Sequence, residues 1–228
     1  MRDGLIPRNV TEAVKVPQIK RKEIQALCAE ETKRLLEAAR EDRFEALYVL
    51  AVTTGLRQGE LLALKWEDVD LERGVLRVRR TLTRAKGKVS LGEPKTASSR
   101  RSVKLTATAA AALREHLSRQ LEEIDRVGSL YNDAGLVFAT EKGTPVNPTN
   151  LGKRSFAPLL ERSNLRMIRF QDLRHTCATL LLGRNINPKL VSEMLGHSTI
   201  VLTLDTYSHL IPAMHGDAAA VMDAVFSA

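Results

Sequence analysis

The chain has 228 residues, a length that accommodates one large domain or two small ones whose core needs no disulfides. Its apolar content of 43% and charged content of 27% are ordinary for a globular protein, and no apolar run approaches the ~18 residues that a transmembrane helix requires. The net charge of +8 favours a polyanionic partner, and an aromatic content of only 4% argues against the base-stacking surfaces of single-strand binders, so duplex DNA is the expected partner.

The N-terminal sequence and the two cysteines indicate a cytoplasmic location. Residues 1–7, MRDGLIP, lack the hydrophobic stretch of a secretory signal. Cys28 and Cys177 are too few and too far apart for a disulfide framework or a zinc site. Both stand in apolar helical contexts, so we expect two small buried side chains in a reducing cytoplasm.

The N-terminal half begins with a segment that has little periodicity. Residues 1–22 contain two prolines and several basic residues, a pattern typical of a linker or of the tail of an upstream domain. Helices dominate after it. Apolar periodicity predicts helices over residues 32–40 and 44–54, the second capped by Gly55, followed by a short helix from Arg57 to Lys65.

Between residues 66 and 105 the apolar period changes to two. This alternation predicts one small antiparallel sheet, punctuated by Gly74, Gly87 and Gly92. Thr106 is a suitable cap for an alanine-rich helix that reaches about residue 120, and residues 136–138 predict a short extended segment. The expected fold class is therefore α+β, mostly helical with a small antiparallel sheet.

Asparagine–proline pairs at 147–148 and 187–188 predict two helix starts, because asparagine caps a helix and proline fits its first turn. Asp172 is predicted to cap a helix that carries Arg174 and ends near Gly183.

Gly196 predicts the end of the helix that starts at residues 187–188, and it leaves His197 at the exit of that helix. A further helix after Ser198 carries Tyr207. At the end of the sequence, residues 217–226 place apolar side chains on one stripe, which predicts a helix with an exposed apolar face.

Several of these segments combine residues suited to chemistry on a phosphodiester. Arginine binds two phosphate oxygens through its planar fork and never loses its charge, and Arg57 and Arg174 stand in marked contexts, TGLRQGE and FQDLRHT. Tyrosine has a pKa near 10, so Tyr207 becomes a nucleophile only where cations and donors surround the group that it attacks. The sequence has no histidine and aspartate cluster with metal-ligand spacing, so we expect neither a metal ion nor another cofactor.

From about residue 23 to residue 228, the chain resembles the catalytic domain of the tyrosine recombinases, the phage integrase family. Five segments carry the resemblance, in the order TTGLRQGELLALKWEDVD, EPKTASSRRSV, DLRHTCAT, LGHS and DTYSH. Matched residue by residue, they give the catalytic set Arg57, Lys95, Arg174, His197 and Tyr207, with Glu60 as a supporting acid.

The resemblance implies a mechanism and an assembly. Tyr207 would attack the scissile phosphate to form a 3′-phosphotyrosine bond, and Lys95 would protonate the departing 5′ oxygen, without metal or ATP. Residues 1–22 would be a linker and the tail of an absent core-binding domain, and residues 23–228 the catalytic domain. Four protomers would act on two duplexes by exchanging the C-terminal helix, 217–226, while the free chain would be a monomer.

One position departs from the family's pattern. Gln171 stands where histidine, or less often lysine, is usual, and a glutamine donates a hydrogen bond but cannot accept a proton near pH 7. His175 is not expected to replace it, because His175 would lie inside the helix, whereas Gln171 would precede the Asp172 cap, where the backbone is not yet helical. His175 is instead interpreted as a structural residue whose ring is hydrogen-bonded within the core. Cleavage is therefore expected to be slower by roughly ten- to a thousand-fold, but not abolished.

Basic residues around the predicted sheet are the expected contacts to DNA phosphates, although a basic run is more often solvated surface. The candidates are Arg79, Arg84, Lys86, Arg100 and Arg101. Two other functions stay open. A type IB topoisomerase uses similar residues to relax DNA, and a DNA-binding fragment with weakened catalysis is the second alternative.

Overall fold

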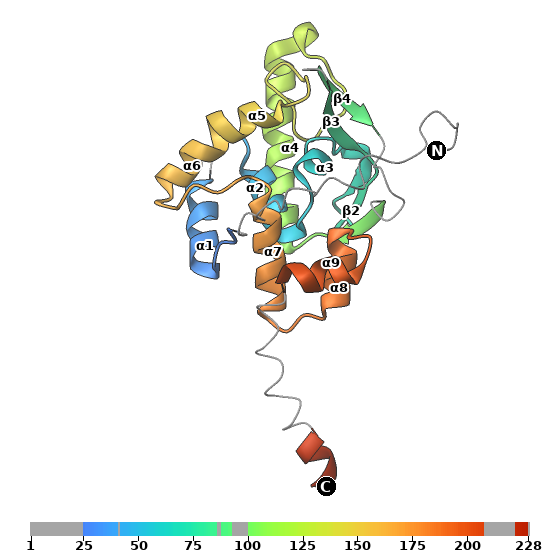
Figure 1. Cartoon of the computed structure of the whole chain (residues 1–228). Coiled ribbons are helices and arrows are strands. Elements are labelled where there is room, and N and C mark those ends of the chain that lie inside the picture. The colour runs from blue at the N-terminus through green and yellow to red at the C-terminus, as the bar shows by residue number, and fades with distance from the viewer. Residues whose placement is uncertain (1–24, 41, 86–87, 93–99, 208–221, 228) are drawn as a thin grey trace, which may run out of the picture.

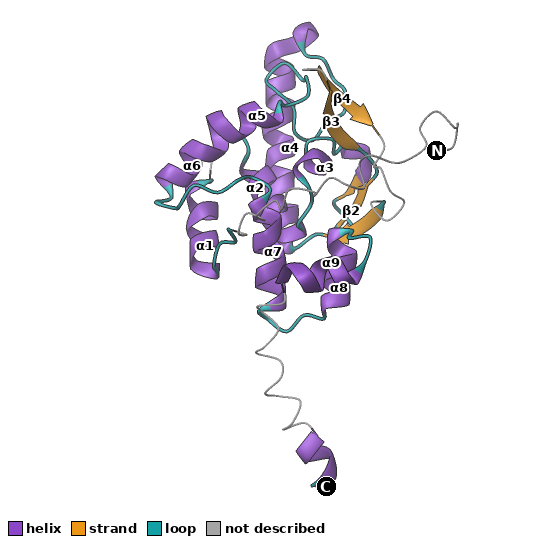
Figure 2. Cartoon of the chain, in the orientation of Figure 1, coloured by secondary structure: helices purple, strands orange, loops and turns teal. Residues whose placement is uncertain are grey.

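The computed structural model describes residues 25–40, 42–85, 88–92, 100–207 and 222–227 (Figures 1 and 2). Helices make up most of these residues, and the strands gather on one flank of the molecule (Figure 2). Among the described residues, no helix is both long enough and apolar enough to cross a membrane.

The core is built around α2, Glu45–Thr54, whose sequence EALYVLAVTT is apolar on almost every side. A helix without a polar face must be covered all round. It packs against α1 (Ala29–Ala38), α4 (Ala107–Val127) and α7 (Asp172–Leu182). Leu47, Tyr48 and Leu50 are fully buried.

The end of α2 is fixed by a glycine that the sequence marks correctly. Gly55 has φ of +62°, the left-handed conformation that most residues avoid. A Cβ atom at this position would also lie 2.4 Å from Cδ2 of Leu195, at the end of α8 (Pro188–Leu195). The turn after α2 and the end of α8 are therefore in close contact.

The strands form two sheets rather than the single sheet expected. β1 (Val69–Asp70), β2 (Val75–Val78) and β5 (Arg101–Lys104) pair antiparallel in the order β1-β2-β5, and β3 (Thr81–Ala85) and β4 (Lys88–Gly92) form a separate hairpin. The split falls after Val78, where residues 79–80 leave the β2–β5 ladder and so carry the chain into the hairpin.

Several boundaries also differ from the prediction. The helix after Gly55, α3, covers only Gln58–Leu61 and is followed by a 3-10 turn, Trp66–Asp68. Thr106 caps α4 as expected, but α4 continues to Val127, well beyond residue 120. The prediction for Cys28 was wrong, because this residue is exposed and caps α1 through its sulfur, whereas Cys177 is buried as expected.

The second half of the chain adds two groups of helices. The helices α5 (Pro148–Leu151) and α6 (Ala157–Arg162) join through a π-helical segment, Gly152–Phe156. Asn147 and Asn187 cap the helices that follow them, as predicted. Then α7, α8 and α9 (Ile200–Tyr207) lie together at one end of the molecule (Figure 1).

The helix α7 begins one residue earlier than expected. Asp172 is the first residue of the helix, and Gln171 before it already has helical dihedrals, φ −63° and ψ −21°. The carboxylate of Asp172 binds Arg169, accepting from its backbone N–H and its guanidinium. The side chains of residues 171, 174 and 175 therefore leave the same face of one continuous helical segment.

The predicted C-terminal helix is described only in part. Residues 222–226 are helical, and Met222, Val225 and Phe226 are exposed. The other half of the predicted range, 217–221, lies outside the described residues, as does the predicted linker, 1–22.

Candidate active site

The first arginine motif forms a buried ionic network at the start of α3. Arg57 caps α3, and its Nη1 donates to Oε1 of Glu60 over 2.8 Å, while its backbone N–H donates to Oε2 over 2.9 Å. Glu60 is only 3% exposed and also accepts from Nη2 of Arg101 over 2.9 Å. Burial by itself would raise the pKa of Glu60, but its bonds to Arg101 and Arg57 hold that pKa below its ordinary value.

The same network reaches the end of α8. Nη2 of Arg57 donates to the carbonyl of Gly196 over 3.1 Å, and Nε of Arg101 donates to the carbonyl of Met194 over 2.6 Å. Gly196 has φ of +69°, and a Cβ there would lie 2.9 Å from Nη1 of Arg101. The glycine thus gives α8 its left-handed end and leaves room for the guanidinium.

The second arginine, Arg174, is held by backbone carbonyls from two other segments. Its Nη1 donates to the carbonyls of Gly55 (2.8 Å) and Leu195 (2.7 Å), and its residue exposure is 5%. Its Nη2 is buried and finds no hydrogen-bond partner in the part of the chain that the structure describes. Burial, followed by repulsion from Arg57, lowers the pKa of Arg174 to about 10, which leaves the guanidinium charged at neutral pH.

His197 follows the left-handed end of α8, as the sequence predicts. Its backbone N–H donates to the carbonyl of Ser192, and its Nδ1 lies 2.7 Å from Oγ1 of Thr203 on α9. Burial, with the positive charges of Arg174 and Arg57, lowers the pKa of His197 to about 4, so the ring is neutral at pH 7. The Thr203 contact uses one ring nitrogen and fixes the direction of the other.

Tyr207 ends α9 and is 1% exposed. Its hydroxyl oxygen lies 2.8 Å from Nδ1 of His175 on α7. Burial raises the pKa of Tyr207, and the charge of Arg174 opposes that rise. The ring of His175 is thus hydrogen-bonded to a buried group, as predicted, and that group is the hydroxyl of the predicted nucleophile.

Gln171 lies beside the first arginine motif. Its Oε1 accepts from the backbone N–H of Gln58, the first residue of α3, over 3.3 Å. The structure therefore brings five of the six predicted catalytic positions into one region: Arg57, Gln171, Arg174, His197 and Tyr207. The sixth, Lys95, lies outside the described residues.

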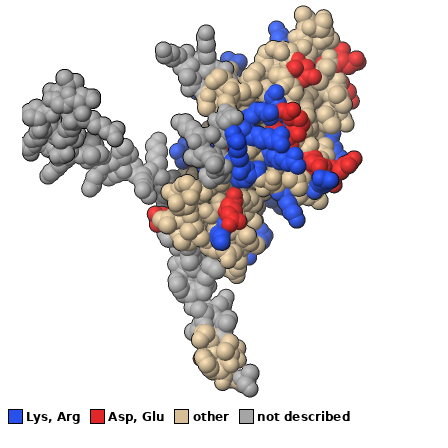
Figure 3. Space-filling model, turned by 90° about the vertical axis from the view of Figure 1, so that its right-hand side faces the viewer, with Lys and Arg blue, Asp and Glu red and all other residues tan. Residues whose placement is uncertain are grey.

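The predicted DNA contacts have different positions. Figure 3 shows lysine and arginine side chains, mixed with acidic ones, gathered on the face that carries the sheets. Arg79, the residue after β2, is half-exposed and lies 3.3 Å from Asp68, and Arg100 is exposed. Arg101 differs from the expected surface contact, because its side chain is 8% exposed and bound to Glu60. Lys86 and the side chain of Arg84 lie outside the described part of the chain.

Three members of the site were missed or misread from the sequence, although signals for each exist. Arg101 is two residues before the buried Val103 on β5, so the period of a strand puts both on one face. Thr203 is four residues before Tyr207 on α9 and shares its helix face. His175 is four residues after Gln171, and only the misplaced start of α7 separated the two.

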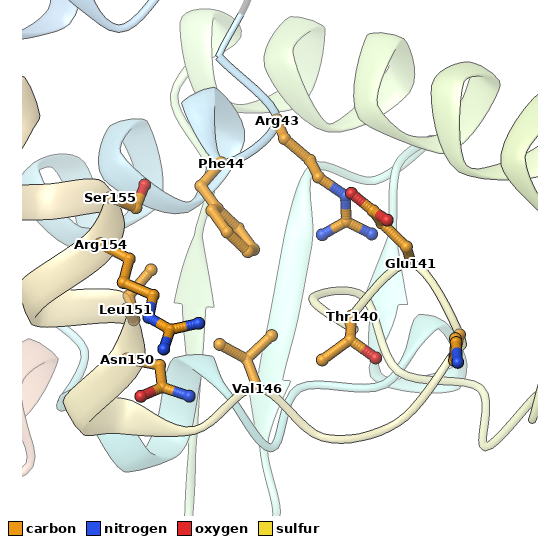
Figure 4. A pocket seen from close by; sticks show the side chains of 10 residues that line it. Arg43, Phe44, Thr140, Glu141, Val146, Asn150, Leu151, Arg154 and Ser155 are labelled. Carbon is orange, nitrogen blue, oxygen red and sulfur yellow. The ribbon is translucent and has the colours of Figure 1, made fainter.

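A cavity with a largely apolar lining lies away from these residues. It has a volume of about 440 Å³, and its lining comes from the start of α2, the turn at residues 140–146 and the α5 region. Phe44, Val146 and Leu151 supply its apolar surface, and the guanidinium of Arg154 reaches into it (Figure 4). None of the predicted catalytic residues lines it. Within the described residues, no group of three or more histidine, cysteine, aspartate or glutamate side chains could hold a metal ion.

Comparison with known proteins gives a consistent result. The sequence model of the phage integrase family matches residues 25–214. The chain is 41% identical to a "Tyrosine recombinase XerC-like" protein of Caldanaerobacter subterraneus subsp. tengcongensis, over 90% of this chain and 55% of that protein. It is 29% identical to the ICEBs1 integrase of Bacillus subtilis, over 97% of this chain and 60% of that protein. The chain thus spans little more than half the length of these relatives.

Solved structures share the fold. A crystal structure of XerA recombinase superimposes with a TM-score of 0.68 at 25% identity, covering 86% of this chain and 65% of that one. The Tn1549 transposon integrase in complex with circular intermediate DNA gives a TM-score of 0.72 at 23% identity, covering 96% of this chain and 72% of that one. The mostly helical α+β fold expected from the sequence is confirmed.

Proposed function

This chain belongs to the phage integrase family as a tyrosine recombinase catalytic domain, and from that premise we propose that it cleaves and rejoins duplex DNA in site-specific recombination. One observation carries the proposal. The hydroxyl of Tyr207 is hydrogen-bonded to the imidazole of His175 and lies in the field of Arg174, whose buried Nη2 has no hydrogen-bond partner among the described residues. A buried guanidinium N–H without an acceptor is costly, and a phosphate oxygen is the acceptor that it suits best.

In the proposed reaction the two arginines bind the non-bridging oxygens of the scissile phosphate. Glu60 holds Arg57 from one side, and the carbonyls of Gly55 and Leu195 hold Arg174, so neither guanidinium has to be ordered at the moment of reaction. Preorganised donors aimed at developing charge are usually the largest contribution to catalysis. The neutral ring of His197, fixed through Thr203, supplies a further donor.

The oxygen of Tyr207 then attacks the phosphorus, and the bond to the 5′ oxygen breaks. Lys95 is proposed to protonate that leaving oxygen, as the family resemblance implies. The product is a 3′-phosphotyrosine bond and a free 5′ hydroxyl, and a 5′ hydroxyl of a second duplex reverses the step. The bond energy is retained in the intermediate, so the scheme needs neither ATP nor a metal ion.

Tyr207 is buried in the DNA-free chain, so DNA binding must expose its hydroxyl before attack. The basic residues on the sheet face are proposed to bind phosphates of the duplex, and Arg79 and Arg100 are the candidates whose exposed side chains the structure describes. We also propose that residues 1–22 connect to a core-binding domain. Four chains would assemble on two duplexes through the segment 217–226, whose described residues expose Val225 and Phe226.

The experiment that tests this function traps covalent complexes on DNA. The protein is incubated with supercoiled plasmid, quenched with SDS, and analysed for DNA joined to protein, with Tyr207→Phe beside it. We expect an adduct that the variant lacks completely. An adduct of equal yield from Tyr207→Phe would contradict the assignment. Relaxation of the same plasmid without exchange between two sites would instead favour the topoisomerase-like activity.

A further inference from the structure

His175 contacts the proposed nucleophile, a partner that the sequence did not indicate. Its Nδ1 is 2.8 Å from the hydroxyl oxygen of Tyr207, the distance of a direct hydrogen bond, and the ring centroids are 6.0 Å apart. The two residues come from different helices, α7 and α9, so chain connectivity alone does not enforce this contact. His175 is therefore in reach of the one proton that Tyr207 must lose.

The other candidates for accepting that proton are less suitable. Gln171, one helical turn before His175 on the same face, has an amide side chain without useful basicity. His197 has its Nδ1 engaged with Thr203. Among the described residues, His175 is the base for which a hydrogen bond to the tyrosine hydroxyl is seen.

The surroundings of His175 keep its ring neutral, as a proton acceptor requires. Burial lowers the pKa of His175, the carboxylate of Asp172 opposes that shift, and the charges of Arg174 and Arg169 add to it. From the other elements, Tyr207 on α9 contacts the ring, and His197 at the exit of α8 is close enough to interact with it electrostatically. When a phosphate enters between the arginines, its negative charge favours the imidazolium and raises the basicity of the ring.

We propose that His175 is a catalytic residue, the general base that takes the proton of Tyr207 as its oxygen attacks, in place of the base that Gln171 does not supply. This inference rests on the DNA-cleaving function proposed above. In the forward step the O–H bond of Tyr207 breaks, its oxygen bonds to phosphorus, and Nδ1 of His175 becomes protonated. In the reverse step the imidazolium returns that proton to the departing tyrosine oxygen.

The first test measures the single-turnover rate of SDS-resistant adduct formation on supercoiled plasmid as a function of pH. The informative variant is His175→Asn, because asparagine keeps an acceptor near the Nδ1 position but cannot take up a proton. We expect a rate at least about a hundredfold lower than that of the unchanged chain, and loss of the rise in rate with pH that a titrating histidine produces. Gln171→His in the same background should recover part of the rate, because it restores a base one turn away.

Two results would overturn the proposal. If His175→Asn or His175→Ala forms the adduct as fast as the unchanged chain, His175 is not the base. If either variant forms it faster, the contact is a resting latch that holds Tyr207 away from DNA. Thermal unfolding of each variant separates loss of the fold from loss of the chemistry. A misfolded His175 variant would also not regain its rate of adduct formation when Gln171→His is added.

The second test needs no DNA and so separates this proposal from the proposed function. The ¹⁵N chemical shifts of the His175 ring report which nitrogen carries the proton. We expect an unprotonated Nδ1 at neutral pH, with a change in its shift in Tyr207→Phe, where the bonded hydroxyl is removed. A protonated Nδ1 that donates to the tyrosine oxygen would contradict the proposal, whatever the chain does to DNA.

Discussion

Glu60→Gln tests the network that holds the first arginine. The carboxylate accepts from the backbone N–H and Nη1 of Arg57, at 2.9 and 2.8 Å, and from Nη2 and Nη1 of Arg101, at 2.9 and 3.3 Å. Glutamine keeps one acceptor oxygen and turns an NH2 group toward the remaining donors, so about two charge-assisted bonds are lost. At about 1.5–3 kcal/mol each, this predicts a loss of about 3–6 kcal/mol in the free energy of unfolding, which overlaps the range of about 3–5 kcal/mol seen when one partner of a buried pair is removed.

Urea unfolding at several pH values is the assay. The pKa of Glu60 is lowered in the folded chain, so its stabilisation is complete above the unfolded value of about 4.5 and is lost as the pH falls through the folded value. The gap between the unchanged chain and Glu60→Gln should therefore be full at pH 7 and shrink below about pH 4.5.

The matched control for this experiment is Glu37→Gln. Glu37 pairs with Lys33 at 4.0 Å on the exposed side of α1, where both side chains are more than half exposed, and such a pair is worth under ~0.5 kcal/mol. Equal losses in the two variants, or a Glu60→Gln gap that does not change with pH, would refute the reasoning.

Three further predictions concern the other supports of the site. Thr203→Val removes the hydrogen bond to His197 but keeps the shape of the side chain, so the rate of adduct formation should fall about tenfold or more while the melting temperature changes little. An unchanged rate, or a fall in rate that only accompanies a large drop in melting temperature, would contradict a positioning role. Gly196→Ala places a Cβ at φ +69° and 2.9 Å from Nη1 of Arg101, so it should cost about 1–3 kcal/mol in chemical denaturation, and an unchanged midpoint would refute this. The pKa of His197 is about 4 in the folded chain, below its unfolded value of about 6.5, so the free energy of unfolding should fall as the pH drops from about 6.5 to about 4. The expected fall is on the order of 1–2 kcal/mol after allowance for partial exposure, and His197→Asn should remove part of it.

Helix ends and their glycines were predictable from the sequence because their causes are local. Gly55 and Gly196 both adopt the left-handed conformation expected of a glycine that ends a helix. These two turns place the segments that carry Arg57 and His197, so the broad arrangement of the site follows from short-range signals.

The tertiary partners were not predictable in the same way. Arg101 was expected to contact DNA. Its guanidinium instead binds Glu60 and the carbonyl of Met194, which are far from it in the sequence and are brought next to it only by the fold. For His175 the difference was local, since Gln171 is already helical and Asp172 is not the cap. The sequence placed that helix start one residue too late, and so it did not bring His175 together with the position of Gln171.

The central claim, that Tyr207 is the residue joined to DNA, is tested most directly by mass spectrometry of the trapped adduct. The adduct is digested with nuclease and protease, and the peptide that carries the remaining nucleotide is sequenced. The chain has three tyrosines, so Tyr48 and Tyr131 serve as internal controls. We expect a nucleotide on Tyr207 alone, and a nucleotide on either of the other two tyrosines, or on a serine, would show that Tyr207 is not the nucleophile.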